Sequence, residues 1–306
     1  MSSGSTPPGV RSPLLEKLRA ALLLRHYSPK TVEAYLSWIR RYVIHHQRRH
    51  PRELGAGHVA AFLSHLATQR QVSASTQNQA LAALLFLYAE VLEQPLGLVG
   101  GVVHARRPLR IPTVMTKAEV DVLLSKLDGL WRLMASLMYG AGLRLMECAS
   151  LRVKDLDFET GQVLIRRGKG QKDRVTLMPR SLVEPLRAHV AEVREQHAAD
   201  LEAGSGYVEL PSAVRLKYPN ASREWPWQWA FPATRRYLDP VTGEQRRHHI
   251  HETALQRAVR EAALAAALGK SVSGHTLRHS FGTHLPEAGY DIRFRSCSAA
   301  AMCGPP

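Results

Sequence analysis

Four runs of apolar residues at helical spacing fall within the first 92 residues and leave little room for other secondary structure. Leucines recur every three or four positions over residues 14–22, and one continuous apolar stripe follows over 28–43. Ser28-Pro29 is a favourable helix start, with serine as the cap and proline at the first helical position. Residues 58–66 and 75–92 repeat the same period. The sequence therefore predicts a small all-α bundle over residues 13–97.

The rest of the chain mixes helices with a little β-structure. Residues 98–113 contain Gly, Pro and Arg without periodicity, which is typical of a linker between domains. Beyond them we expect helices at about 116–127, 130–140, 181–200 and 252–267, and two short strands, 163–165 and 175–177, joined by a hairpin turn. The predicted fold class is mainly α with a small β-sheet, with a second domain over 114–293 that carries an irregular stretch at about 201–247.

Several features exclude whole classes of protein. Residues 1–12 are polar and predict a disordered tail rather than a signal peptide. No run of about 18 apolar residues exists that could span a membrane. Three cysteines are too few and too scattered for a disulfide framework or a zinc site. We expect a soluble protein of a reducing compartment.

The charge points to a polyanionic partner. The chain has a net charge of +15, and residues 1–113 carry net +9, with 12 arginines against two lysines. Arginine suits bidentate phosphate contacts, although a merely basic protein is an equally good reading of charge alone. Lys30, Arg40 and Arg41 lie off the apolar stripe of their helix, and Arg106 and Arg107 lie in the linker. These five side chains are candidates for contact with a nucleic-acid backbone.

Three elements then follow in a definite order. They are the stretch from Tyr139 to Glu147 (YGAGLRLME), Lys169 in the hairpin turn, and His275-Thr276-Leu277-Arg278-His279. The order resembles that of the tyrosine recombinases, the phage integrase family, and the resemblance covers the chain from about Leu14 to Ile292. It implies an N-terminal four-helix SAM-like DNA-binding domain followed by an α+β catalytic domain.

The resemblance assigns a role to each residue of these motifs. Arg144 and Arg278 would clamp the nonbridging oxygens of a scissile phosphodiester and stabilise the charge of its transition state. His275, three residues before Arg278, shares its helix face and would assist as an acid or base. Lys169 would protonate the leaving 5′ oxygen, and Glu147, one turn after Arg144, would orient that arginine.

Simpler interpretations exist for the same residues. Arg144 could merely cap a helix, and Lys169 could be an ordinary solvated lysine of the hairpin. His279, taken to lie on the opposite side of its helix, is more often a packed structural histidine than a catalyst. His248, His249 and His251 could suggest a metal site, but no acidic or cysteine cluster accompanies them.

The stretch at 201–247 is similar to the insertion of integron integrases, which recombine a folded single-stranded attC site with an attI site. The resemblance implies that this insertion holds bases pushed out of the attC stem. Aromatic rings stack on unpaired bases, worth ~1–3 kcal/mol each, while arginines contact phosphate. An alternating aromatic pattern could also mark a strand with one buried face. The candidate residues are Trp225, Trp227, Trp229 and Phe231, beside Arg223, Arg246, Arg247, His248 and His249.

The chain departs from the family near its C-terminus. The nucleophilic tyrosine is expected roughly 35 residues after His275, and residues 294–306 contain neither a tyrosine nor the motifs that precede it. Tyr290 is too close to Arg278 to replace it. A truncation or a frameshift would explain this, because the codons from Cys297 onward can spell a family-like stretch in another frame. Pro286 stands where the family has a helix former, and an interior proline costs ~3 kcal/mol.

These expectations combine into one functional hypothesis. The chain is identified as a member of the integron integrases, with duplex attI and folded attC DNA as partners, no cofactor, no metal and a cytoplasmic location in bacteria. Its intact form would assemble as a homotetramer on DNA and cut through a 3′-phosphotyrosyl intermediate; this chain would bind without cutting and assemble more weakly. The alternatives are a remnant that only binds DNA, and a metal-dependent nuclease that uses the histidines.

Overall fold

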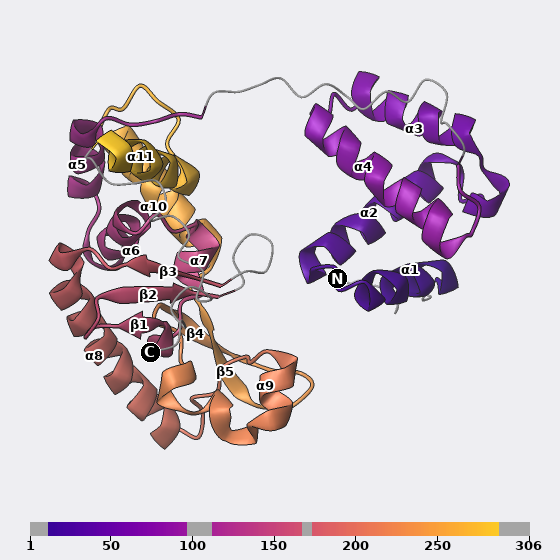
Figure 1. Ribbon diagram of the computed structural model, residues 1–306. Coiled ribbons are helices and arrows are strands. Elements are labelled where there is room, and N and C mark those ends of the chain that lie inside the picture. Colours follow the sequence, from indigo (N-terminus) through magenta and orange to yellow (C-terminus); the bar gives the residue numbers. More distant parts are fainter. Residues whose placement is uncertain (1–11, 97–111, 167–172, 288–306) are drawn as a thin grey trace, which may run out of the picture. The chain divides into compact units, whose positions relative to one another are not determined.

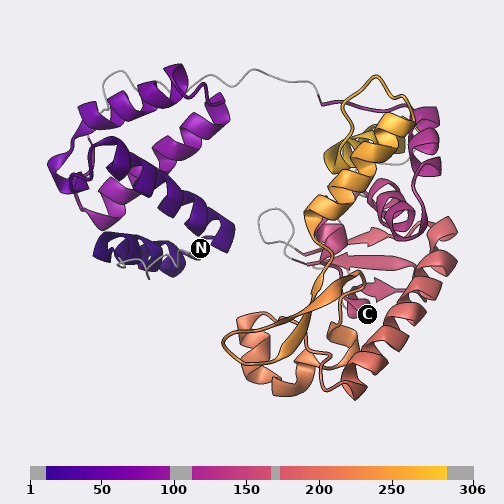
Figure 2. The same cartoon turned by 180° about the vertical axis from the view of Figure 1, so that it is seen from behind.

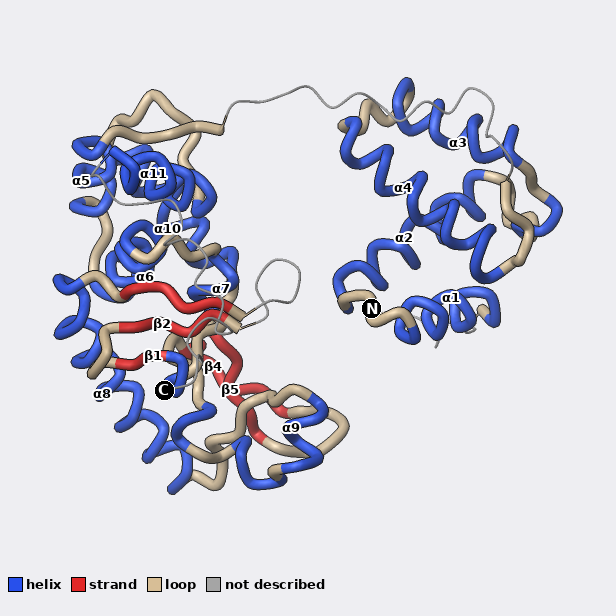
Figure 3. The backbone as a smooth tube through the Cα atoms, viewed as in Figure 1, coloured by secondary structure: helices blue, strands red, loops and turns tan. Residues whose placement is uncertain are grey.

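The computed structural model describes residues 12–96, 112–166 and 173–287. Over these ranges the protein is mainly helical with two small antiparallel sheets, which confirms the predicted fold class (Figures 1 and 3). The chain divides into two compact units, residues 1–110 and 111–306, with the division inside the predicted linker. Most of both predicted tails, most of the linker with Arg106 and Arg107, and the turn with Lys169 lie outside the described residues.

The first unit consists of the four predicted helices. They are α1 (Pro13–Leu24), α2 (Pro29–His45), α3 (Ala56–Thr68) and α4 (Ala74–Phe86), and α4 continues into a π-helical turn, Leu87–Val91. The Ser28 hydroxyl accepts a hydrogen bond from the Thr31 amide at 3.2 Å, so the predicted cap forms. Helix α4 packs against α2 and α3, and α1 packs against α2.

The core of the first unit joins α2 to α4 through polar as well as apolar contacts. Tyr42 and Tyr88 are buried, and their hydroxyls are 3.0 Å apart. The Tyr88 hydroxyl also contacts the Pro51 and Leu54 carbonyl oxygens at 2.9 and 3.0 Å. Because buried hydroxyls need such partners, these contacts position the loop after α2 against α4.

The second unit holds seven α-helices within the described residues and both sheets. The helices are α5 (Lys117–Ser125), α6 (Gly129–Gly140), α7 (Leu145–Ala149), α8 (Arg180–Glu202), α9 (Ser212–Lys217), α10 (Glu252–Ala265) and α11 (Gly274–Glu287). The strands are β1 (Leu156–Asp157), β2 (Gln162–Ile165), β3 (Arg174–Leu177), β4 (Pro232–Leu238) and β5 (Gln245–His249). Figures 1 and 2 show the long helix α8 running past the first sheet toward the β4–β5 hairpin. None of the helices in the described ranges is both long and apolar enough to cross a bilayer.

The predicted hairpin is present, and the sheet is one strand larger than expected. Strands β2 and β3 pair antiparallel, with Leu164 opposite Val175, and the short β1 adds to the free side of β2. Its two residues are too few for a period to be visible in the sequence.

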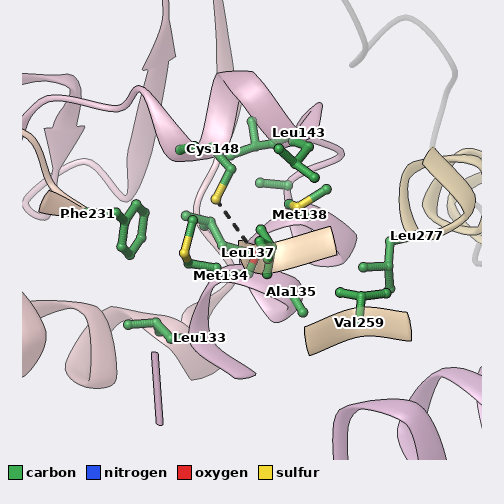
Figure 4. Packing of buried hydrophobic residues seen from close by; sticks show 14 of the residues in the cluster. Leu133, Met134, Ala135, Leu137, Met138, Leu143, Cys148, Phe231, Val259 and Leu277 are labelled. Carbon is green, nitrogen blue, oxygen red and sulfur yellow. Dashed lines mark hydrogen bonds between the residues drawn. The ribbon is translucent and has the colours of Figure 1, made fainter. Parts of the chain in front are cut away.

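The core of the second unit surrounds α6. Met134, Leu137 and Met138 are buried, and Figure 4 shows them among Leu143 and Cys148 and near Val259 of α10 and Leu277 of α11. The Cys148 thiol lies 3.8 Å from the Met134 carbonyl oxygen, and burial raises its pKa. It therefore serves as a packing residue.

The interpretation of residues 201–247 as irregular is wrong, because helix α9 lies in the first half and two strands begin in the second half. Strands β4 and β5 form a hairpin there, with a bulge between Pro232 and Arg236. The alternating tryptophans do not form a strand either, because Trp225–Trp227 is a single 3₁₀ turn. The pattern of period two therefore reflects a tight turn followed by a buried segment, not a pleated face.

Candidate active site

A tight turn presents Arg144 at the end of α6. Gly142 adopts φ +64°, and Arg144 then precedes the first residue of α7. A Cβ at Gly142 would lie 2.5 Å from two ring carbons of Phe281, so the turn needs glycine for both its conformation and its space. The Glu147 carboxylate, one turn into α7, accepts a hydrogen bond from the Arg144 backbone amide at 2.8 Å.

Glu147 is the centre of an arginine cluster. Its Oε1 accepts hydrogen bonds from Arg144 Nη1 at 2.6 Å and from Arg174 Nη1 at 2.8 Å, and its Oε2 accepts one from Arg174 Nη2 at 2.6 Å. Arg278 Nη1 lies 3.5 Å from Oε2 and donates to the Gly142 carbonyl oxygen. Two helices, one strand and one turn thus bring three guanidinium groups to one carboxylate.

The charge of Glu147 is strongly stabilised. Burial by itself would raise the pKa of this carboxyl group, but the hydrogen bonds from Arg174 and Arg144 outweigh it and lower the pKa to about 2. Glu147 therefore stays ionised at any pH at which DNA is handled.

Helix α11 carries Arg278 because its opposite face is fixed in the core. Leu277, Ser280 and His284 are buried; the Ser280 hydroxyl accepts from the Met115 amide at 2.9 Å, and His284 Nδ1 lies 2.8 Å from the Tyr139 hydroxyl. The described part of α11 runs past Pro286 to Glu287, so the proline does not end the helix before that point.

A cavity of about 380 Å³ lies where these elements meet. It is lined by Gly142, Arg174, Thr176, Arg278, His279 and Phe281, among others. The interpretation of His279 as a packed histidine on the far side of α11 is wrong: it is exposed and lines this cavity beside Arg278. Residues i and i+4 share a helix face, so His279 lies on the face of His275.

The structure brings some of the predicted catalytic residues together and not others. Arg144, Glu147 and Arg278 come together as described, and His275 is exposed in the first turn of α11 without being among the residues that line the cavity. Lys169 lies outside the described residues. Sequence reasoning missed Arg174; the available signal was a cation at the start of a strand directly after the turn that carries Lys169.

The insertion is attached to the catalytic core through Arg152. This side chain is buried, donates to the carbonyl oxygens of Trp227 and of Glu209 (2.7 Å for the latter), and lies over the Trp229 ring at 3.9 Å. The backbones run alongside as well, since the Val153 amide donates to the Gln228 carbonyl oxygen at 3.0 Å. Trp229 is 8% exposed, so its ring serves this attachment.

Replacing Arg152 by leucine should loosen the insertion. Two buried carbonyl oxygens would lose their charged donor, which costs about 2–3 kcal/mol of local stability. We expect faster cleavage within residues 203–245 in limited proteolysis, by more than tenfold. Arg187→Leu, on the exposed part of α8, is the control and should digest like the wild type. Equal rates for both variants would contradict the role of Arg152.

Several other predicted DNA contacts in the insertion are also engaged internally. Arg246 is 5% exposed and pairs with Asp239 and Glu244, and Arg247 donates to both carboxylate oxygens of Asp200 at 2.8 Å. The His249 ring is buried too, and burial lowers its pKa. The physical reason is the same in each case: a cation or ring enclosed by the insertion stabilises its fold. These three, like Trp229, offer little surface to DNA.

Four predicted contacts of the insertion keep accessible surface. Arg223 is exposed and lies over the Tyr207 ring at 5.1 Å, and Trp225, Trp227 and His248 are half-buried. The Lys154 ammonium lies 2.7 Å from the centre of the Trp227 ring. Burial and the neighbouring Arg166 lower the pKa of Lys154 to about 8. Accessible aromatic rings near cations are the combination that binds unpaired bases.

In the first unit, the predicted backbone contacts are all at the surface. Lys30, Arg40 and Arg41 are exposed on α2, and Arg41 lies over the Trp38 ring at 4.9 Å. Among the residues described, no three histidine, cysteine or acidic side chains gather as a metal site would require.

Comparison with known proteins agrees with this arrangement. A model of the phage integrase N-terminal SAM-like domain matches residues 14–98, and a model of the phage integrase family matches residues 113–295. An integrase/recombinase of Escherichia coli is 44% identical over 295 residues, covering 96% of this chain and 88% of the relative, and one of Pseudomonas aeruginosa gives the same values. The tyrosine recombinase XerA of Thermococcus kodakarensis is 30% identical over 92% of this chain and 83% of its own.

Solved structures share the fold. A lambda integrase dimer bound to a COC′ core site matches with a TM-score of 0.60 at 15% identity, over 92% of each chain. The XerH recombinase bound to its difH substrate matches with a TM-score of 0.58 at 19% identity, over 95% of this chain and 79% of XerH. The two family models and the relatives together show that this chain belongs to the phage integrase family, the tyrosine recombinases that break and rejoin DNA at specific sites.

Proposed function

We propose that the chain is a site-specific recombinase of the integron type, which acts on attI and attC sites in bacterial DNA and therefore in the cytoplasm. The observation that carries the proposal is the Glu147-centred cluster beside a cavity lined by Arg278. Two guanidinium groups that converge from different elements suit the two nonbridging oxygens of one phosphodiester.

The chemistry divides among the residues as follows. Arg144 and Arg278 hold the phosphate and stabilise its charge as the attacking oxygen adds. His275, three residues before Arg278 on α11, moves a proton at that phosphate, and Lys169 protonates the leaving 5′ oxygen. Phosphotyrosyl exchange conserves the energy of the broken bond, so it requires neither a cofactor nor a metal. Residues 291–306 contain no tyrosine, so the 306-residue chain supplies the phosphate-binding groups without an identified nucleophile.

The integron assignment is supported by the insertion. Trp225 and Trp227 are half-buried rather than enclosed, and cations lie against both, Arg194 at Trp225 and Lys154 at Trp227, which suits bases that leave the stem of a folded single strand. Lys30, Arg40 and Arg41 of α2 would contact the adjoining duplex, and Arg106 and Arg107 of the linker would contact its phosphate backbone. Assembly of a homotetramer on DNA belongs to this proposal as well.

A binding experiment tests the proposal. We expect the 306-residue protein to shift a single-stranded attC hairpin in a gel, with an affinity that falls steeply with salt because each neutralised phosphate releases counterions. Trp225→Ala should weaken hairpin binding by about tenfold, as expected for one lost stacking contact, and leave binding to a fully paired duplex unchanged. Binding that ignores ionic strength, or equal loss on both DNAs, would refute the assignment.

The second candidate function is a protein that occupies att sites without cutting them, favoured by the absence of a tyrosine after Tyr290 in the sequence. A suicide substrate separates it from the active recombinase. The 306-residue chain should give no protein–DNA adduct that survives SDS, and such an adduct would show that a nucleophile is present within it.

A further inference from the structure

Arg174 is the one member of the arginine cluster that neither the motifs nor the proposed chemistry uses. It stands at the start of β3, its side chain is 17% exposed, and it grips both oxygens of Glu147 at 2.6 and 2.8 Å. A fork of this kind is the strongest contact that an arginine makes with a carboxylate.

The hydrogen bonds of Glu147 leave its carboxylate saturated. Arg174 supplies one donor to each oxygen, and Arg144 supplies one more to each, from its backbone amide and its Nη1. Two donors on each oxygen fill the four acceptor positions of an ionised carboxylate. Arg278 Nη1 forms a longer ion pair with Oε2, at 3.5 Å, outside ordinary hydrogen-bond distance.

We infer that Arg174 is a positioning residue: by filling the acceptor positions of Glu147, it prevents this carboxylate from capturing Arg278 and keeps the Arg278 guanidinium directed at the phosphate. The inference rests on the proposed phosphate site. Without Arg174, two acceptor positions would open beside Arg278, and a move of less than 1 Å would form a close ion pair. That ion pair would compete with the phosphate for the same guanidinium.

The matched control lies on the same hairpin. Arg166 directly follows β2, the strand that pairs with β3. Its side chain is 46% exposed and forms an ion pair with Asp155 at 2.6 Å. Arg166→Ala removes one positive charge close to the site without touching Glu147. Comparison with Arg174→Ala therefore separates the specific contact from the general loss of charge.

The test titrates the full chain with inorganic phosphate in a calorimeter. We expect Arg174→Ala to bind phosphate about tenfold more weakly than the wild type, as for the loss of one charged hydrogen bond, and Arg166→Ala to stay within about twofold. Arg174→Lys keeps the charge but loses the fork, so its affinity should lie between those of the wild type and the alanine variant. Thermal unfolding of each variant shows whether it is folded at the titration temperature.

The decisive variant is the double substitution Glu147→Gln/Arg174→Ala. A neutral amide attracts Arg278 far less than a carboxylate does, so the double variant should recover much of the affinity lost in Arg174→Ala. If Arg174 acted only on the fold, the double variant would bind phosphate no more tightly than Arg174→Ala, and that result would overturn the inference. So would an Arg174→Ala affinity equal to that of Arg166→Ala. A wild type that binds neither phosphate nor DNA would instead refute the proposed function and, with it, this role.

Discussion

Replacing Glu147 by alanine is expected to lower the free energy of unfolding of the second unit by about 3–5 kcal/mol, as for other buried ion pairs that lose one partner. Three guanidinium groups would then face one another without their carboxylate, and the Arg144 amide would lose its acceptor. Urea unfolding followed by tryptophan fluorescence measures this, because Trp131, Trp225, Trp227 and Trp229 all lie in this unit. An unchanged urea midpoint would contradict the stabilising role of Glu147.

Glu147→Gln separates the charge from the shape. The folded-state pKa of Glu147 is about 2 against an ordinary 4.5, so its stabilising effect is complete above pH 4.5 and is lost as the pH falls toward 2. This difference corresponds to about 3 kcal/mol. Wild-type stability should therefore fall more steeply between pH 4.5 and 2 than that of Glu147→Gln. Parallel pH profiles for the two proteins would show that the carboxylate is not the group responsible.

The second large effect is expected at Gly142. Alanine there would adopt φ +64° and place its Cβ 2.5 Å from the Phe281 ring, so we expect a loss of about 2–4 kcal/mol from backbone strain and overpacking together. The turn also supplies the carbonyl oxygen to which Arg278 donates, so phosphate binding should weaken in the same variant.

Gly161→Ala provides the control for Gly142→Ala. Gly161 has the same φ of +64°, and a Cβ built there meets nothing within 4 Å. Its substitution should cost only the backbone term, about 1–2 kcal/mol, and leave phosphate binding unchanged. Denaturant unfolding of both variants gives the comparison; equal losses would mean that the contact with Phe281 contributes nothing.

Much of the fold followed from local sequence signals, because those signals act within a few residues. Ser28 caps α2, Thr116 caps α5 with its hydroxyl 3.2 Å from the Glu119 amide, and the predicted strands pair as a hairpin. In the site, the i, i+3 spacing of Arg144 and Glu147 correctly indicated that the two side chains interact.

What the sequence could not predict depends on contacts between distant segments. Trp229 and Trp227 look equivalent in the sequence, yet only Trp229 is buried, because it belongs to the apolar cluster of Val208, Leu210 and Ala221. Arg152, from far earlier in the chain, also lies closer to the Trp229 ring (3.9 Å) than to the Trp227 ring (5.6 Å). Arg246 looked like a phosphate ligand until the hairpin placed Asp239 and Glu244 beside it. The place of His279 needs no distant contact, because it lies four residues after His275 and therefore on the same face of α11.

The attachment of the insertion through Arg152 has a consequence for protein engineering. Arg152 donates to carbonyl oxygens, and the neighbouring backbones are joined amide to carbonyl, so the attachment is made largely through main-chain atoms. The Arg152 guanidinium also lies over the Trp229 and Trp227 rings, at 3.9 and 5.6 Å. The exposed side chains of residues 203–245 can therefore be exchanged while the attachment through Arg152 is kept. Libraries that vary this stretch and retain Arg152 and Trp229 should yield folded recombinases with altered preference for structured single strands.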